Sequence, residues 1–209
     1  VEDRAGALKM TTAAASRFLT HLDLDVNLDD WQKWAVGAGI HPTVRSFLRA
    51  QPQHLHRFKP EENPRSFPCP RTWEHVSTMA HRKPGIELGL ELYKGAVGEG
   101  AAASYVAHEQ ICADLPDPES VIAKPDKAPI PKDPAVMYGL TAALVEVIRQ
   151  KSTAPRIGSL MEYLNRIPSE FAVLTILDSV HAGVKVLEHP AGQKFAGQHR
   201  DVIFRAVAR

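Results

Sequence analysis

The sequence has 209 residues, of which 44% are hydrophobic and 23% are charged, a composition typical of an ordinary soluble globular protein. Lys and Arg number 25 against 24 Asp and Glu, so the chain has no global basic charge to hold a nucleic-acid backbone or an anionic membrane. We therefore expect neither nucleic acid nor membrane as a partner.

The cysteines and the ends of the chain give a first view of its context. Cys69 and Cys112 are too few for a disulfide framework and form no C-x-x-C pair, so we expect small buried thiols and a cytoplasmic protein. No apolar run approaches the roughly 18 residues of a membrane span, and the start carries no signal-peptide pattern. Because the chain begins with Val1 instead of Met, we expect it to be a piece of a longer protein.

Residues 1–27 contain the one segment that predicts a strand. The stretch from Thr20 to Val26 alternates apolar and polar residues, which is typical of a strand with one solvated face. A single strand cannot satisfy its own edges, so we expect its partners to come from a longer chain or from a second copy. A short helix is predicted over residues 11–18, with Phe18 buried and Arg17 pointing outward.

From Leu28 onward the apolar spacing is helical. Asn27 or Asp29 can cap the first helix, and Gly37 and Gly39 can stop it. Further helices are predicted over residues 41–50, 71–81, 86–97, 101–113, 134–150, 156–166 and 168–183, and the tail 197–209 predicts a last one. The side chains expected to face the core include Trp31, Trp34, Ala35, Val44, Phe47, Leu48, Trp73, Val76, Ser77, Leu140, Leu144, Val147, Leu174, Leu177 and Val180.

Two proline-rich segments interrupt this pattern. Residues 52–70 predict an irregular surface loop, because prolines alternate there with charged residues. Residues 114–134 contain six prolines and predict an extended linker with no core of its own. The prediction is thus a mostly α chain with a crossover near its middle.

The common catalytic and metal motifs are missing or incomplete. No Gly-Lys pair occurs, so the phosphate-binding loop G-x-x-x-x-G-K-[ST] is absent. The glycines between Gly95 and Gly100 follow a predicted helix and favour a helix-to-helix turn over a phosphate cradle. The run from His108 to Cys112 lacks the second histidine of a zinc-protease helix, and His54 and His56 have no third ligand nearby, so we expect solvated loop histidines and no metal site.

Two arginines are candidate functional residues. Arg17 precedes the predicted strand, and Arg71 follows Pro70 at the first turn of a helix. The helix dipole disfavours a cation at that position by about a few tenths of a kcal/mol. The presence of Arg71 there is explained if an anion binds to it. The alternative for both is a surface arginine paired with Asp or Glu.

Several short motifs stand around these arginines at fixed spacing. They are Asp3-Arg4-Ala5-Gly6, Met10, Ser16-Arg17-Phe18-Leu19-Thr20-His21-Leu22, Asp29-Asp30-Trp31, Trp34-Ala35, His41-Pro42, Phe47-Leu48, Phe67-Pro68-Cys69-Pro70-Arg71-Thr72-Trp73-Glu74 and residues 95–102, followed by Tyr163-Leu164, Pro168 and Glu170-Phe171.

Together these motifs resemble the C-terminal part of a MoxR-like AAA+ ATPase. The resemblance implies that the P-loop and the Walker B motif lie upstream of Val1. It implies that Arg17 is the arginine finger, which reaches the γ-phosphate bound by a neighbouring subunit. It implies that Arg71 is the sensor-2 arginine of the helical lid, whose planar guanidinium can fork onto phosphate oxygens.

The resemblance also implies a domain plan and a function. Residues 1–27 would end the α/β core as a remnant, 28–113 would form the helical lid, 114–134 a linker and 135–209 a C-terminal helical extension, so that the fold class is mainly α. The intact protein would be a ring, expected to be a hexamer, that uses ATP and Mg²⁺ to remodel or mature a client, with a von Willebrand A type protein as a possible partner.

The alternative from a different class is a stand-alone helical interaction or scaffold protein without catalytic activity. The predicted strand distinguishes the two, because a scaffold has no use for one strand of an α/β core. In either case this chain lacks a backbone cradle and a P-loop lysine. We therefore expect it to bind ATP weakly or not at all by itself and to be inactive as an ATPase.

Overall fold

The structure is a computed structural model, which describes residues 10–20, 22, 24–58 and 65–200. Within these residues the chain is mainly helical and contains no strand, which confirms the mainly α class. The helices are α1 Thr12–Ala15, α2 Leu28–Gly37, α3 Pro42–Ala50, α4 Pro70–Ala80, α5 Ile86–Val97, α6 Glu99–Ala113, α7 Pro118–Ala123, α8 Pro134–Gln150, α9 Ala154–Leu164, α10 Ser169–His181 and α11 Pro190–Gln198, with 3₁₀ turns at Pro52–His54 and Val186–Glu188.

Most helix starts are encoded locally. Asn27 accepts a hydrogen bond from the amide of Asp30 at the start of α2, and Asp133 accepts one from Ala135 at the start of α8. Proline occupies the first turn of α3, α4, α7, α8, α9 and α11, where its missing N–H costs nothing. The predicted bounds of α5 and α8 are confirmed to the residue, and those of the other predicted helices up to α10 to within about three residues.

One hydrophobic core lies among α2 to α6. Phe47 of α3 is fully buried at its centre, with its ring centroid 5.2 Å from that of Trp73 on α4 and 5.5 Å from that of Tyr105 on α6. Tyr93 of α5 completes the aromatic cluster, 5.1 Å from Tyr105. Burial of such large rings favours the packing of α3 against α4 and α6.

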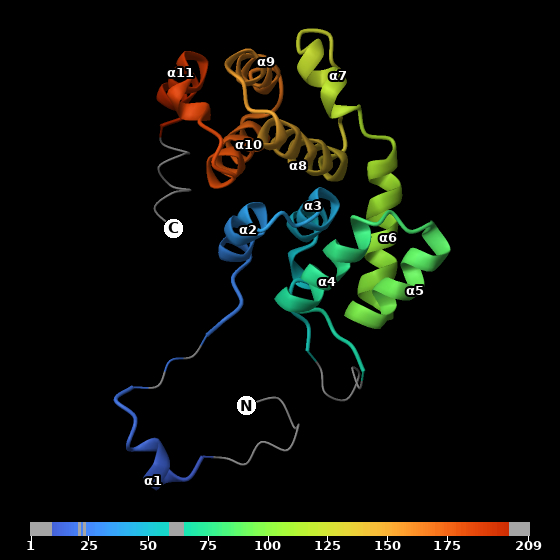
Figure 1. The fold of residues 1–209 in the computed structure, drawn as a ribbon, viewed down its shortest axis with the longest axis vertical. Helices are drawn as coiled ribbons and strands as arrows, with labels where there is room; N and C mark the ends of the chain where they lie inside the picture. The colour runs from blue at the N-terminus through green and yellow to red at the C-terminus, as the bar shows by residue number, and fades with distance from the viewer. Residues whose placement is uncertain (1–9, 21, 23, 59–64, 201–209) are drawn as a thin grey trace.

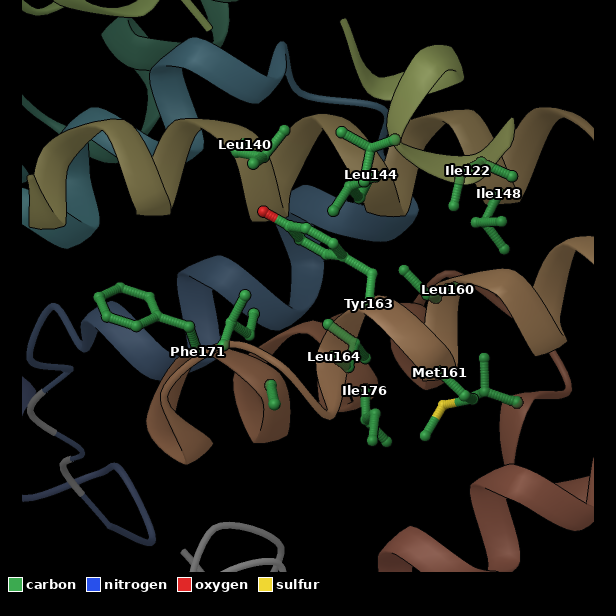
Figure 2. Close-up of a cluster of buried hydrophobic side chains, with 14 of the residues drawn as sticks. Ile122, Leu140, Leu144, Ile148, Leu160, Met161, Tyr163, Leu164, Phe171 and Ile176 are labelled. Carbon is green, nitrogen blue, oxygen red and sulfur yellow. The ribbon is translucent and has the colours of Figure 1, made fainter. Parts of the chain in front are cut away.

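A second core lies among α7 to α11 (Figure 2). Leu140 and Leu144 of α8 face the side chains of α9, and Tyr163 points between the two helices. The Tyr163 hydroxyl donates a 2.9 Å hydrogen bond to the carbonyl of Pro129, which satisfies the polar end of this buried ring.

The two cores meet along α3. Figure 1 shows α2 and α3 lying against α8 and α10, although more than 80 residues separate α3 from α8 in the sequence. The helices predicted for the lid and for the C-terminal extension therefore share an interface. The division into a lid domain at residues 28–113 and a C-terminal extension at residues 135–209 stays a prediction.

The strand predicted over residues 20–26 is wrong for the residues that the structure describes. Residues 20, 22 and 24–26 have no strand conformation, and residues 21 and 23 lie outside the described part. Leu22 and Leu24 are exposed, so their alternation has no sheet to pack against. The helix before it is shorter than predicted, and Phe18 is exposed instead of buried.

Three predictions for the second half are corrected as well. Residues 114–134 are not coreless, because Val121 and Ile122 of α7 are buried against α8 and α9. On α10, Val180 is exposed and Ile176 is buried, because α8 and α2 cover a different face from the one that the spacing suggested. The last described helix is α11, ahead of the predicted tail helix, whose residues 201–209 lie outside the described part.

Candidate functional site

Arg71 lies in the first turn of α4, one residue after Pro70. Its side chain is exposed, and within the described residues it forms no hydrogen bond or ion pair. The turn that carries it is rigid, because the amide of Cys69 donates to Thr72 Oγ1 at 2.9 Å and that hydroxyl donates to the carbonyl of Phe67 at 3.0 Å. The guanidinium thus projects from a fixed helix end toward solvent.

The loop before α4 is held against the same helix. Trp73 Nε1 donates to the carbonyl of His54 at 2.7 Å, and the amide of Arg57 donates to the carbonyl of Pro68 at 3.0 Å. His54 packs on Phe47 with ring centroids 5.3 Å apart, and burial, followed by the charge of Arg57, lowers its pKa. His54 is therefore half-buried, contrary to the prediction, whereas His56 is exposed as predicted.

A cavity of about 270 Å³ opens beside this loop at the start of α6. It is lined by His54, Arg57, Pro68 and residues 97–101. Gly98 has a φ of 80°, and a β-carbon there would lie 3.3 Å from the carbonyl oxygen of Ser66, so glycine is required at this turn between α5 and α6. Figure 1 shows α4 and α6 starting at the same end of the helical bundle, so Arg71 and the cavity share that end.

The structure does not bring the two predicted arginines together. Arg17 is an exposed residue of the turn that follows α1. Figure 1 shows α1 lying apart from the bundle formed by α2 to α11, whereas Arg71 lies on that bundle. Arg17 and Arg71 therefore lie on separate parts of the chain.

A buried polar network surrounds α3, and the sequence analysis missed it. Ser46 Oγ lies 2.8 Å from His108 Nε2 of α6, which lies 3.4 Å from Cys112 Sγ. Burial lowers the pKa of His108 to about 4, although the charge of Asp133 opposes the shift, and burial raises the pKa of the Cys112 thiol to about 11. A neutral imidazole and an un-ionised thiol fit a structural role, since a reactive cysteine needs a lowered pKa.

The strongest electrostatic feature that the sequence analysis missed is a buried ion-pair cluster. Asp178 of α10 lies 2.7 Å from Arg49 and 3.7 Å from Arg45, both on α3. Arg45 is 2% exposed and also donates to the carbonyl of Ala142 on α8 at 3.2 Å. The one sequence signal was a charge inside an apolar stripe, because Arg45 stands between Val44 and Phe47.

In the described part of the chain, no group of three or more His, Cys, Asp or Glu residues is placed to hold a metal ion. Among the same residues, no helix has both the length and the apolar character that crossing a membrane requires. The chain matches no protein-family model, no curated protein and no solved structure.

Proposed function

We propose that this chain supplies the helical lid of a MoxR-like AAA+ ATPase and that Arg71 contacts nucleotide phosphate as its sensor-2 residue. The observation that supports this proposal is the position of Arg71, exposed and without a described partner at the positive end of the α4 dipole. A cation placed against the dipole with no carboxylate to compensate it is suited to an anionic ligand.

The surroundings of Arg71 are consistent with this role. The first-turn amides of α6 begin at the same end of the bundle, and the α6 N-terminus has no side-chain cap. Arg57 adds a second guanidinium on the wall of the cavity there. Glu99 in the first turn of α6 also lines the cavity and offsets part of this positive charge, so attraction for phosphate would depend on Arg71, Arg57 and the first-turn amides.

In the proposed assembly, Arg17 acts in trans as an arginine finger. A cytoplasmic ring, proposed to be a hexamer, would bring Arg17 of one subunit to the γ-phosphate held by its neighbour. ATP and Mg²⁺ would be held by the P-loop half characteristic of such ATPases, and hydrolysis would drive remodelling or maturation of a client, with a von Willebrand A type protein as a proposed partner. The separation of Arg17 from Arg71 is compatible with such a division between subunits.

The test is Mg²⁺-dependent ATP hydrolysis by the full-length protein and three variants. Arg17→Ala is expected to lower turnover on the order of a thousandfold, as removal of an arginine finger does in other phosphoryl-transfer systems. Arg71→Ala is expected to weaken nucleotide affinity, turnover or both. Arg82→Ala is the matched control, because Arg82 is an exposed arginine just past the other end of α4. Wild-type behaviour of both test variants would overturn the two assignments.

The alternative is a helical interaction protein without catalysis. The observation that favours it is that residues 20, 22 and 24–26 form no strand, so the feature that distinguished the two hypotheses is missing from the described residues. Helices α2 to α11 also bury two cores of their own. A full-length protein that neither binds nor hydrolyses ATP would support this alternative against the ATPase.

A further inference from the structure

A second cavity, of about 260 Å³, lies among α2, α3, α8 and α10, where the two halves of the bundle meet. Its volume falls just below the roughly 300 Å³ at which pockets for drug-sized ligands begin, so it suits a smaller molecule. One wall is apolar and is formed by Leu28, Phe171 and Leu174. The rest of the lining includes the amide of Gln32, the guanidinium of Arg49 and two carboxylates, and the charges of these groups limit which ligand can bind.

Gln32 of α2 lines this cavity with a side chain that is fixed in place. Its side chain is 3% exposed, and its Nε2 donates to the carbonyl of Arg45 at 3.0 Å. That hydrogen bond fixes the amide orientation and leaves Oε1, which is buried and has no hydrogen-bond partner among the described residues. This oxygen is closed off from the cavity by its surroundings, so Gln32 contributes a fixed part of the cavity wall and no direct contact to a ligand.

Arg49 of α3 contributes a guanidinium group that is fixed in place and has N–H donors that form no hydrogen bond. Its Nη2 donates to Asp178 Oδ1 at 2.7 Å, which fixes the guanidinium at the edge of the buried ion-pair cluster. Within the described residues its Nε and Nη1 form no hydrogen bond. Because Asp178 is shared with Arg45, the positive charge of Arg49 is only partly compensated and can bind a carboxylate.

Two exposed carboxylates lie on the lining as well. Asp29 is in the first turn of α2 and Glu170 in the first turn of α10. Neither forms a side-chain hydrogen bond or ion pair with another described residue. These two carboxylates can attract a positively charged group of a ligand, whereas Arg49 can attract a negatively charged group.

We propose that this cavity binds a free α-amino acid with an apolar side chain. The ammonium group would lie near the carboxylates of Asp29 and Glu170, while the carboxylate would accept from Arg49. The side chain would lie against Phe171, whose ring is held by an edge contact with Tyr138 at 4.9 Å between centroids. This site is distinct from the Arg71 end of the bundle and does not depend on the proposed ATPase function.

The experiment is calorimetric titration of the whole chain with leucine and two truncated analogues. In 3-methylbutylamine the carboxylate is missing, and in 4-methylpentanoate the ammonium group is missing. We expect leucine to bind with a dissociation constant in the millimolar range or better, and each analogue to bind at least about tenfold more weakly. The double variant Asp29→Asn/Glu170→Gln should lose leucine affinity by a similar factor.

The control is the double variant Asp30→Asn/Glu162→Gln. Asp30 neighbours Asp29 on α2, and Glu162 is an exposed glutamate of α9, so the same two charges are removed from outside the cavity lining. Its leucine affinity should equal that of the unmodified chain. No leucine binding at millimolar concentration, equal losses in the two double variants, or an amine that binds as well as leucine would each overturn the proposal.

Discussion

Arg49 on α3 donates a 2.7 Å hydrogen bond to Asp178 on α10, and the same carboxylate lies 3.7 Å from the fully buried guanidinium of Arg45. One acidic residue thus holds two basic residues across the interface between the two halves of the bundle. Because buried charges are tolerated only when they are paired, this cluster makes the packing of α3 on α8 and α10 sensitive to one side chain.

Asp178→Asn should therefore destabilise the chain strongly. Removing one partner of a buried ion pair typically costs about 3–5 kcal/mol, because the remaining charge is left uncompensated. Urea unfolding would measure the change in the free energy of unfolding. Glu188→Gln is the control, since Glu188 forms an exposed pair with Lys185, and such pairs contribute about 0–1 kcal/mol. Equal effects of the two substitutions would contradict the assigned role of Asp178.

Arg17→Ala and Arg71→Ala should leave folding almost unchanged. Both side chains are exposed, so each substitution should change the free energy of unfolding by no more than about 0.5 kcal/mol. Thermal or urea unfolding of the isolated chain checks this expectation. A loss of 2 kcal/mol or so from either substitution, well above the surface range, would show that the arginine has a structural partner and would weaken its proposed role in hydrolysis.

Gly139→Ala tests the close approach of α6 and α8. A β-carbon at Gly139 would lie 2.8 Å from Cys112 Sγ and 3.1 Å from Leu115 Cδ1, so a side chain must shift, at a cost of about 1–3 kcal/mol. Gly158→Ala, where the nearest contact is 3.6 Å, should instead be neutral or stabilising, because alanine favours a helix. In a double-mutant cycle, Cys112→Ala should reduce the cost at Gly139, and full additivity would contradict the packing.

His108 and His41 should make stability depend on pH. Burial lowers the pKa of each to about 4 in the folded state, against an ordinary value of 6.5. The unfolded state then binds more protons between these values, so their contribution is complete above pH 6.5 and is lost as the pH falls toward 4. Each histidine contributes up to about 3 kcal/mol to this dependence.

The measurement is urea unfolding between pH 4 and pH 7 for the unmodified chain and His108→Gln. The difference between the two isolates His108 from Glu109, whose pKa is raised by burial and which therefore acts in the opposite direction. His75→Gln, at an exposed position of α4, should keep the full pH dependence. An unchanged slope in His108→Gln would show that His108 titrates alike in the folded and unfolded states.

The sequence alone predicted most of the helices, although not α7 or α11, because helix ends depend on local chemistry. Proline at a first turn, a capping side chain and a glycine stop act within a few residues, and they placed α3, α5 and α8 well. The apolar stripe Val44, Phe47 and Leu48 likewise follows from helical period alone. The exposed position of Arg71 at a helix start was visible for the same reason.

Tertiary structure decided the features that need a distant partner. A strand requires a neighbour to pair with, so the alternation was insufficient to give strand conformation at residues 20, 22 and 24–26, the described part of this segment. The buried face of α10 depends on where α2 and α8 lie, and the pairing of Arg49 with Asp178 joins residues 129 positions apart. The position of Arg45 inside an apolar stripe is visible in the sequence, but the counter-charge that allows its burial is not, because only tertiary packing brings Asp178 close to it.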